Sequence, residues 1–140
     1  MEKNRCSGFT LIELMLVIII LGVLGAVVFP RFVGRAKEAK IAAANTDINS
    51  SLAVALDLYE MDNGFYPATD QGLNALKEEP TSSPTPQNWK GPYIKKSPLD
   101  PWGNPYIYVS PGIHNSDYDL YSLGPDGAEG GGDDIVNWEE

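Results

Sequence analysis

An almost unbroken apolar block close to the N-terminus constrains this chain more than any other feature. Residues 9–29 read FTLIELMLVIIILGVLGAVVF and contain 17 apolar residues out of 21. At about 1.5 Å per residue, a helix of this length spans a hydrocarbon core roughly 30 Å thick. Gly22 and Gly25 are tolerated in such a helix, and Pro30 permits a kink just beyond the block. The block therefore predicts one membrane-spanning helix at residues 9–30.

A secretory signal peptide is the first alternative for an apolar segment at this position. A signal peptide ends in a small-x-small cleavage site, and residues 27–30 (VVFP) offer none. Lys3 and Arg5 precede the block, which favours a cytoplasmic N-terminus, although Arg31 and Arg35 follow the block closely and weaken this orientation. We therefore expect the block to stay with the protein and the rest of the chain to lie across the membrane.

Glu13 places a carboxylate inside the apolar block. Such a group costs on the order of a few kcal/mol in lipid and marks a function or a partner, unless it sits at the interface near the helix end. The eight residues before the block, MEKNRCSG, look like a short basic leader that ends in Gly8. Cleavage between Gly8 and Phe9 would free an amine close to membrane depth. Glu13 could then pair with the amine of a neighbouring copy.

The segment Gly8-Phe9-Thr10-Leu11-Ile12-Glu13-Leu14, followed by the apolar helix, resembles the class III signal of type IV pilins and type II secretion pseudopilins. In that family a membrane-embedded prepilin peptidase cuts after the glycine and methylates the new N-terminal Phe. The resemblance implies a cleaved leader at residues 1–8, N-methyl-Phe9 and Glu13 as the assembly carboxylate. Cys6 is the only cysteine and lies in this leader, so the mature chain would form no disulfide.

The stretch after the block predicts a second helical half. Residues 31–62 contain no Pro and, apart from Gly34, no Gly, and Asn63-Gly64 supplies a C-terminal stop. An apolar stripe at helical spacing is formed by Ile41, Ile48, Leu52, Leu56 and Tyr59. With the apolar block, this predicts a helix of about 55 residues. We expect half of it to pack in lipid or against other copies, and half against a globular head.

Residues 64–140 hold 10 Gly and 10 Pro, a composition typical of many turns and short elements. A short helix is predicted to start at Thr69 or Asp70 and to run to about Lys77, with Leu73 and Leu76 facing inward. Short strands are predicted at Tyr93-Ile94, 106–109 and 119–123. We interpret Trp89, Tyr93 and Trp102 first as anchors of the core or of loops, and second as a functional aromatic surface. The sequence therefore predicts an α+β fold, with a small antiparallel sheet packed on the long helix in a head at residues 31–140.

The net charge of −9 is concentrated at the C-terminal end. Residues 1–96 carry ten basic and ten acidic side chains, whereas residues 97–140 carry nine acidic side chains and no Lys or Arg. The acidic balance argues against a nucleic-acid partner. A disordered acidic tail is the ordinary interpretation of such a charge excess. Residues 118–123 (YDLYSL) are too apolar for that interpretation.

Three of these acidic side chains, Asp126, Asp133 and Asp134, flank a stretch rich in Gly. Carboxylates brought together in one loop repel each other unless a cation neutralises them. Ca²⁺ accepts about six to eight oxygen ligands in flexible geometry, and transition metals fit less well where no His or Cys is near. The spacing predicts either a calcium loop or a merely solvated acidic loop.

Motifs along the second half of the chain resemble the major pseudopilins of type II secretion, the G-type subunits. They are Asn63-Gly64-Phe65-Tyr66-Pro67, Gln71-Gly72-Leu73, Gly91-Pro92-Tyr93, DPWGNPY at residues 100–106 and SLGPDG at residues 122–127. The resemblance implies a structural Ca²⁺ in the C-terminal loop. Its ligands would be the carboxylates of Asp126, Asp133 and Asp134 and the backbone carbonyl of Leu123.

The same resemblance implies a structural subunit of a periplasmic pseudopilus that drives protein export. Such a subunit is stored in the bacterial inner membrane as a single-pass protein, with its N-terminus cytoplasmic and its head periplasmic, and it then polymerises with copies of itself. Membrane lipid, the prepilin peptidase, minor pseudopilins and an inner-membrane assembly platform would be its partners. Two alternatives remain: a type IV pilin that forms surface fibres, and a membrane-anchored calcium-binding envelope protein that never polymerises.

Catalysis has little support in the sequence. His114 is the only imidazole, and a nucleophile–base pair needs both members. The mature chain would offer His114 no cysteine partner. We therefore expect no enzyme.

Overall fold

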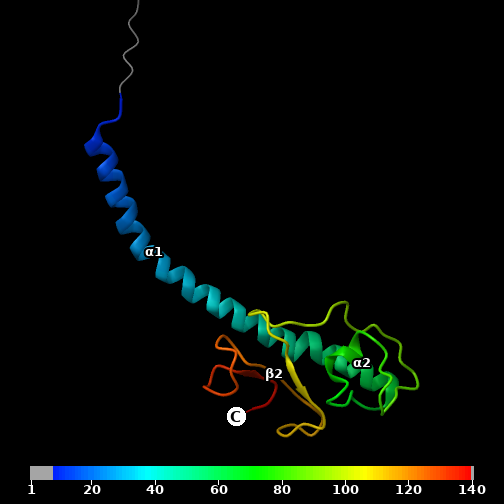
Figure 1. Cartoon of the computed structure of the whole chain (residues 1–140). Coiled ribbons are helices and arrows are strands. Elements are labelled where there is room, and N and C mark those ends of the chain that lie inside the picture. The colour runs from blue at the N-terminus through cyan, green and yellow to red at the C-terminus, as the bar shows by residue number, and fades with distance from the viewer. Residues whose placement is uncertain (1–7, 140) are drawn as a thin grey trace, which may run out of the picture. The chain divides into compact units, whose positions relative to one another are not determined.

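The computed structural model describes residues 8–139, which belong to two compact units. The first unit ends at Glu38 and the second begins at Ala39. Helical elements follow one another along the chain from Leu11 to Asn63 (Figure 1). They are the α-helix α1 (Leu11–Thr46), the π-helical segment η1 (Asp47–Leu52) and the α-helix α2 (Ala53–Asn63).

The described part of the first unit consists mainly of the apolar half of α1. Its large apolar side chains, from Phe9 to Phe29, are exposed rather than packed against other parts of the chain. The helix is long and apolar enough to cross a membrane, and its most apolar stretch is not buried by any of the residues that the structure describes. This agrees with a helix that packs in lipid or against other copies. The predicted boundaries at residues 8 and 30 depend on processing and lipid, and they stay predictions. Cys6 and the rest of the leader before Gly8 lie outside the described residues.

The predicted apolar stripe is confirmed in the second unit. Ile48, Leu52, Leu56 and Tyr59 are buried in the core, and Ile41 packs against it partly buried. The sequence predicted an ordinary α-helix here, whereas η1 is a π-helical segment. Spacings of four residues from Ile48 through Leu56 suit this wider turn, because each of these side chains still reaches the core. Within η1, the Asp47 carboxylate accepts a hydrogen bond of 3.0 Å from the hydroxyl of Tyr106, which directly precedes the first strand of the sheet.

The predicted stop after Asn63 is also confirmed. Gly64 follows α2 with φ +81°, in the left-handed region that favours glycine, and its N–H donates to the Glu60 carbonyl at 2.6 Å. The hydrogen bond satisfies one of the carbonyls that a helix end leaves without an intrahelical partner.

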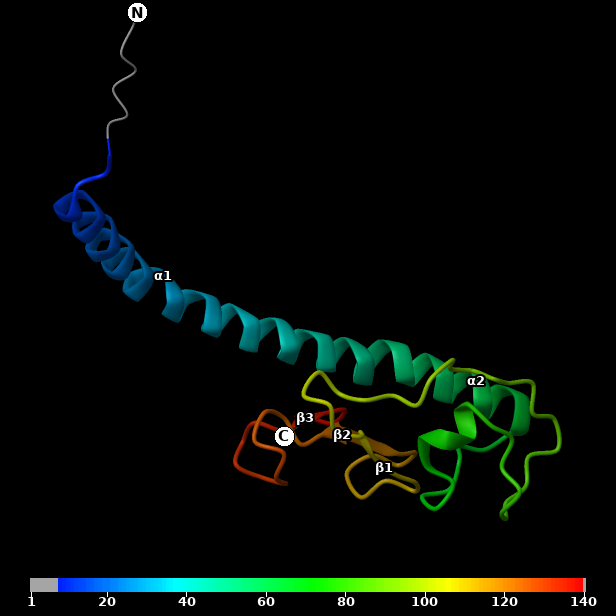
Figure 2. The same ribbon diagram turned by 45° about the horizontal axis from the view of Figure 1, so that its top comes forward.

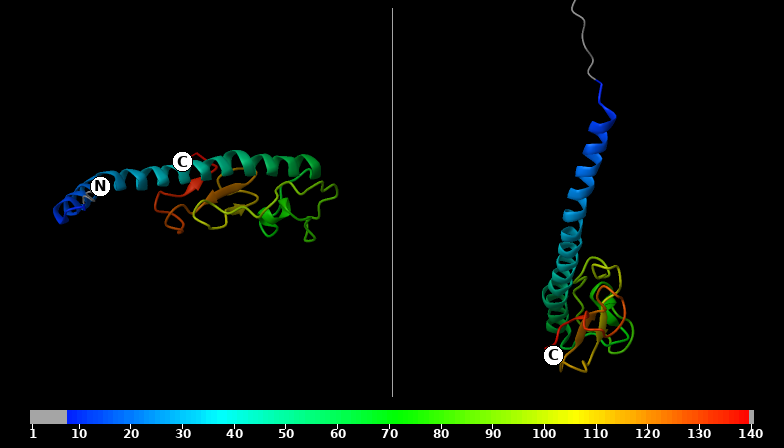
Figure 3. Two further views of the ribbon diagram at one scale, coloured as in Figure 1. Left: turned by 90° about the horizontal axis from the view of Figure 1, so that it is seen from above. Right: turned by 90° about the vertical axis from the view of Figure 1, so that its left-hand side faces the viewer.

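The sheet has three antiparallel strands in the order β1-β2-β3. Strand β1 is Ile107–Val109, β2 is Asp119–Ser122 and β3 is Ile135–Val136. The register pairs Ile107 with Tyr121 and Ser122 with Ile135. Figures 2 and 3 show the strands along one side of the helical segment that contains α2. The predicted strands at 106–109 and 119–123 are confirmed within one residue, and β3 was not predicted.

The predicted strand at Tyr93-Ile94 is wrong. The N–H groups of both residues donate to a single acceptor, the Leu76 carbonyl, at 2.7 and 3.2 Å. They therefore close the end of the short helix η2 (Gly72–Leu76), a 3₁₀ helix, instead of pairing with a strand. A β-prone pair of residues forms a strand only where a partner strand is within reach.

The predicted short helix exists as η2, with Leu73 and Leu76 buried as expected, but its predicted cap is wrong. The residue at the start of η2 is Gln71, and it makes no side-chain capping bond. The Thr69 hydroxyl instead donates to the Ser110 carbonyl at 3.0 Å. Tertiary contact with the end of β1 has replaced local capping.

Aromatic side chains connect the helices to the rest of the head. Tyr59 is fully buried and makes edge-to-face contacts with Phe65 and Tyr93, at centroid distances of 6.2 and 5.7 Å. Trp89 and Trp102 pack partly buried against the core, and the Trp89 indole N–H donates to the Ala75 carbonyl at 3.0 Å. The interpretation of these aromatics as core anchors is confirmed.

Candidate functional site

Thr10 and Glu13 form a closed set of hydrogen bonds at the start of α1. The Thr10 hydroxyl accepts the N–H of Glu13, and the Thr10 N–H and hydroxyl both donate to Glu13 Oε2, each at 3.3 Å. The Thr10 carbonyl accepts the N–H of Leu14, the first backbone bond of the helix. This is a capping box, in which the N-cap residue and the third helical residue satisfy each other's orphan groups.

The capping box gives Glu13 a partner within its own chain. A carboxylate that accepts hydrogen bonds is less costly to hold in an apolar segment than an isolated one. Sequence reasoning missed the role of Thr10, although the T-x-x-E spacing before an apolar run is the usual signal for a capping box. The predicted pairing of Glu13 with the amine of a neighbouring copy involves a second chain, and it stays a prediction.

The predicted processing site precedes the capping box. Gly8 and Phe9 lie before the helix, and the Phe9 side chain is 81% exposed. An exposed peptide bond outside a helix is open to a protease, because the scissile backbone must enter the enzyme's active site.

The predicted calcium loop joins two paired strands. It leaves β2 at Leu123 and enters β3 after Asp134, and the two strands are held in register at Ser122 and Ile135. The acidic segment is therefore a hairpin loop with fixed ends. It begins directly after Ser122, the last residue of β2, which is fully buried.

The structure brings two of the three predicted carboxylates to one point. Asp133 Oδ1 and Asp126 Oδ2 lie 3.2 and 3.6 Å from the position that a Cβ atom on Gly131 would take. The other oxygen of Asp126 accepts the N–H of Ala128 at 2.9 Å. Asp134 is oriented differently, since its Oδ2 accepts the N–H of Gly130 at 2.8 Å.

The ends of the loop approach each other closely at Gly124. A Cβ atom there would collide with the backbone carbonyl of Asp133, and Gly124 has φ +67°. Only a glycine satisfies both conditions, because it has neither a Cβ atom nor a penalty for positive φ. Gly124, which follows the predicted carbonyl ligand Leu123 in the chain, is thus held next to Asp133 in space.

The donor set of this loop fits a hard cation in type but is not closed around one. Asp134 Oδ1 is buried and has no hydrogen-bond partner, and an orphaned buried carboxylate oxygen is costly unless something neutralises it. All predicted ligand atoms are oxygens, which Ca²⁺ prefers. Among residues 8–139, however, no three His, Cys, Asp or Glu side chains are arranged to hold a metal ion. The residues thus fit Ca²⁺ in the chemistry of their oxygen atoms.

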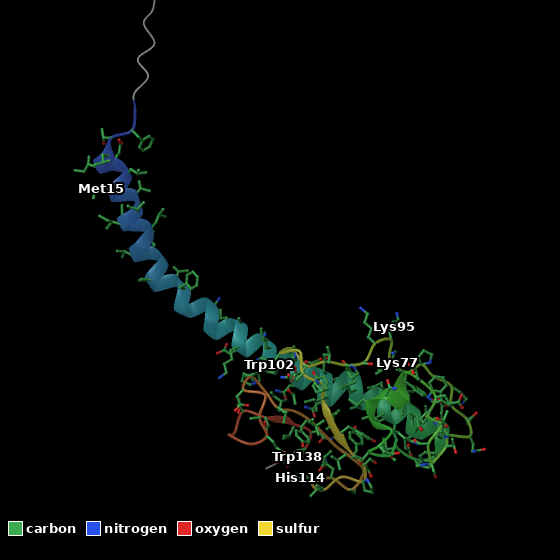
Figure 4. The ribbon with its side chains drawn as sticks, viewed as in Figure 1. Met15, Lys77, Lys95, Trp102, His114 and Trp138 are labelled. Atoms are coloured by element: carbon green, nitrogen blue, oxygen red, sulfur yellow. The ribbon has the colours of Figure 1, made fainter. Side chains whose placement is uncertain are left out.

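His114 belongs to a separate cluster built around the buried carboxylate of Asp119. Asp119 accepts the N–H groups of Ile113, His114 and Asn115 at 2.7 to 2.9 Å, and His114 Nδ1 lies 3.0 Å from it. Burial opposes ionisation of this side chain, but the hydrogen bonds outweigh it and lower the pKa of Asp119 to about 2. The imidazole stacks on Trp138 at 4.1 Å (Figure 4). The cluster fixes the turn between β1 and β2.

Comparisons with known proteins agree with this arrangement of an apolar N-terminal helix and a small head. The profile of the family described as "Type II secretion system (T2SS), protein G" matches residues 31–138, and the prokaryotic N-terminal methylation motif matches residues 3–29. Type II secretion system core protein G of Pseudomonas aeruginosa is 52% identical over 143 residues, which cover 99% of each chain. The Escherichia coli K12 protein of the same description is 51% identical, over 98% of this chain and 92% of its own.

A solved structure gives the same result in three dimensions. The crystal structure of the major pseudopilin from the type 2 secretion system of enterohaemorrhagic Escherichia coli superposes with a TM-score of 0.68 and 40% identity. The match covers 75% of this chain and 87% of that one. The methylation motif, the head and the fold all lead to one assignment: this chain belongs to the protein G family of the type II secretion system, the family of the major pseudopilins.

Proposed function

We propose that this chain is the structural subunit of a periplasmic pseudopilus that drives protein export by type II secretion. The observation that carries the proposal is the order of two matches on one chain, the methylation motif at residues 3–29 followed by the protein G family at residues 31–138. A surface-fibre pilin and a non-polymerising envelope protein are not favoured, since the relatives that align along nearly the whole chain are core proteins of the secretion system.

The apolar half of α1 supports storage in the inner membrane. Its side chains between Leu11 and Phe29 are exposed in the monomer, and they would contact lipid first and neighbouring helices later. The prepilin peptidase would remove residues 1–8 on the cytoplasmic side and methylate Phe9. The head would lie in the periplasm, where minor pseudopilins and the inner-membrane assembly platform are its further partners.

The capping box suggests how Glu13 is handled before assembly. In the monomer its carboxylate accepts hydrogen bonds from Thr10, at 3.3 Å each. These long bonds are weak, so an amine freed at Phe9 of a neighbouring copy would displace them at little cost. Glu13 would then neutralise that amine and set the register between subunits.

The acidic loop would hold one structural Ca²⁺. Asp126, Asp133 and Asp134 would offer carboxylate oxygens, and Leu123 its backbone carbonyl. A bound cation would supply positive charge that relieves the repulsion among these groups. Asp126 and Asp133 already converge beside Gly131, and the unpaired Oδ1 of Asp134 would gain a partner. The head would thereby become more rigid, so that subunits pack uniformly.

Complementation of export tests the main proposal. In a host that lacks its own protein G, this chain should restore release of secreted proteins into the medium. Glu13→Ala should abolish release, because the freed amine loses its partner, while Glu38→Ala should retain it. Glu38 is the matched control, an exposed carboxylate of the same helix outside the apolar block. Export with Glu13→Ala at the level of the unchanged chain would contradict the role of Glu13.

A further inference from the structure

A buried polar contact links the DPWGNPY turn to the start of the acidic loop. The Asp100 side chain is only 4% exposed and Ser122 is fully buried, and the Ser122 hydroxyl donates to Asp100 Oδ2 at 2.6 Å. The other oxygen, Asp100 Oδ1, accepts the N–H groups of Trp102 and Asn104 at 3.0 and 2.8 Å. Both oxygens of the Asp100 carboxylate therefore accept hydrogen bonds, and the Ser122 hydroxyl must act as the donor to Oδ2.

Ser122 passes this contact on to the acidic loop. The Gly124 N–H donates to the Ser122 hydroxyl oxygen at 3.1 Å. A hydroxyl has one proton, and here that proton is committed to Asp100, so the oxygen is left free to accept from Gly124. The direction of the whole chain of bonds, from Gly124 through Ser122 to Asp100, is fixed by the charge at its end.

Gly124 is the residue at which the two ends of the acidic loop meet. Its Cα stands against the backbone carbonyl of Asp133, with no room for a Cβ atom. The same turn that holds Asp100 also reaches the loop a second time, since Asn104 Nδ2 lies 3.6 Å from a Cβ position on Gly127. The turn at residues 100–104 is therefore bonded to the end of β2 through Asp100 and lies near the first half of the loop through Asn104.

We propose that Asp100 and Ser122 are positioning residues for the cation loop. They hold the backbone at Leu123 and Gly124 against Asp133, so that the carbonyl and carboxylate oxygens are close to their final places before a cation arrives. This inference rests on the proposed calcium binding. Groups outside the ligand shell that orient ligands commonly change metal affinity by about 10- to 100-fold when they are removed.

The test uses the full chain in detergent micelles, with calcium chloride as the probe. Calcium affinity is measured by isothermal titration calorimetry for the unchanged chain, Ser122→Ala, Asp100→Asn and the control Ser116→Ala. Ser116 is an exposed serine of the same head, and its hydroxyl donates to the neighbouring Asp117 side chain at 3.2 Å. We expect affinity to fall about 10- to 100-fold for Ser122→Ala, by less for Asp100→Asn, and to stay unchanged for Ser116→Ala.

A second readout concerns the chain without calcium. Hydrogen exchange of the Gly124 N–H should be slow in the calcium-free unchanged chain, because the Ser122 hydroxyl accepts it, and fast in Ser122→Ala. The hydrogen exchange of the Gly124 N–H in the unchanged chain can be measured whether or not the variants fold. If Ser122→Ala does not fold, Ser122→Cys replaces it, since a thiol keeps the side chain nearly the same size but is a weaker donor and acceptor.

The outcomes separate the two proposals. If the unchanged chain shows no calcium-dependent heat, calcium binding itself is wrong. If the unchanged chain binds calcium and Ser122→Ala, or its Ser122→Cys substitute, binds equally well, positioning is wrong and the contact is merely structural, even if the variant melts earlier. Rapid exchange of the Gly124 N–H in the unchanged chain also overturns positioning. Weaker calcium binding together with faster exchange supports it.

Discussion

Asp119→Asn removes the charge at the centre of the turn between β1 and β2 while it keeps the size of the side chain. Asp119 is 2% exposed and accepts three backbone N–H groups, at 2.7 Å from Ile113 and 2.9 Å from both His114 and Asn115. An asparagine has one carbonyl oxygen in place of two charged oxygens. It must also place an N–H₂ group among these donors, and it loses the stronger, charge-assisted bonds.

The size of the effect follows from the pKa. The hydrogen bonds overcome the opposing effect of burial and lower the pKa of Asp119 from the ordinary value of 3.8 to about 2. At 1.36 kcal/mol per pKa unit, the ionised side chain contributes about 2.5 kcal/mol to the free energy of unfolding at neutral pH. We expect Asp119→Asn to lower that free energy by about this amount, which corresponds to roughly 10 to 20 °C in melting temperature for a domain of this size.

The contribution of Asp119 to the free energy of unfolding depends on pH. Because the folded pKa is lower than the unfolded one, the contribution is complete above about pH 4 and is lost as the pH falls towards 2. Thermal unfolding is followed by near-ultraviolet circular dichroism, to which Trp138 on the stacked His114 contributes. Asp117→Asn, an exposed carboxylate two residues away, is the control and should leave the melting temperature nearly unchanged. A shift for Asp119→Asn as small as that of the control would mean that the Asp119 charge does not stabilise the turn.

Three further predictions concern single contacts. Thr10→Ala should destabilise the first turn of α1 by about 1 kcal/mol, seen as faster amide exchange at Glu13 in micelles, and Thr10→Ser should not; equal exchange in both would contradict the capping box. Gly124→Ala should lower the free energy of unfolding by about 1–3 kcal/mol, and with it the melting temperature, because φ is +67° and Asp133 blocks the Cβ position. An unchanged melting temperature would contradict the close approach of Gly124 to Asp133. Tyr108→Phe should cost about 1 kcal/mol in urea unfolding, since its hydroxyl donates to the Pro67 carbonyl at 2.8 Å; no loss would contradict that bond.

Sequence reasoning located the helices because their signals are local and repeated. The stripe from Ile48 to Tyr59 and the stop at Gly64 lie on one continuous segment, so periodicity and a single glycine were enough. The same reasoning placed β1 and β2 within one residue of their observed ends. It missed β3, because Ile135–Val136 is only two residues long and pairs with β2 across a glycine-rich loop.

The errors lie where distant residues compete with local preferences. Tyr93-Ile94 has strand propensity, but its N–H groups close η2 through the Leu76 carbonyl. Thr69 is a residue type that often caps helices, but its hydroxyl donates to the carbonyl of Ser110, 41 residues away. A single sequence does not carry information about such pairings, because they depend on how the turns bring the segments together.

The candidate site divides in the same way. Glu13 was found because a charge in an apolar block is conspicuous, and the acidic loop because three carboxylates flank a run of glycines. The contact between Asp100 and Ser122 joins residues 22 apart, each of an unremarkable type in its own motif. Only the fold shows that the turn and the loop support each other.

Mass spectrometry of the mature N-terminus tests the central claim, that this chain is a processed pseudopilin, most directly. The chain is expressed in a bacterium that has a prepilin peptidase and in an otherwise identical strain that lacks it, and it is purified from the membrane fraction of each. We expect the first sample to begin at Phe9 with one added methyl group and the second to keep residues 1–8. A chain that keeps its leader in both strains, or that is cut elsewhere, is not a processed pseudopilin.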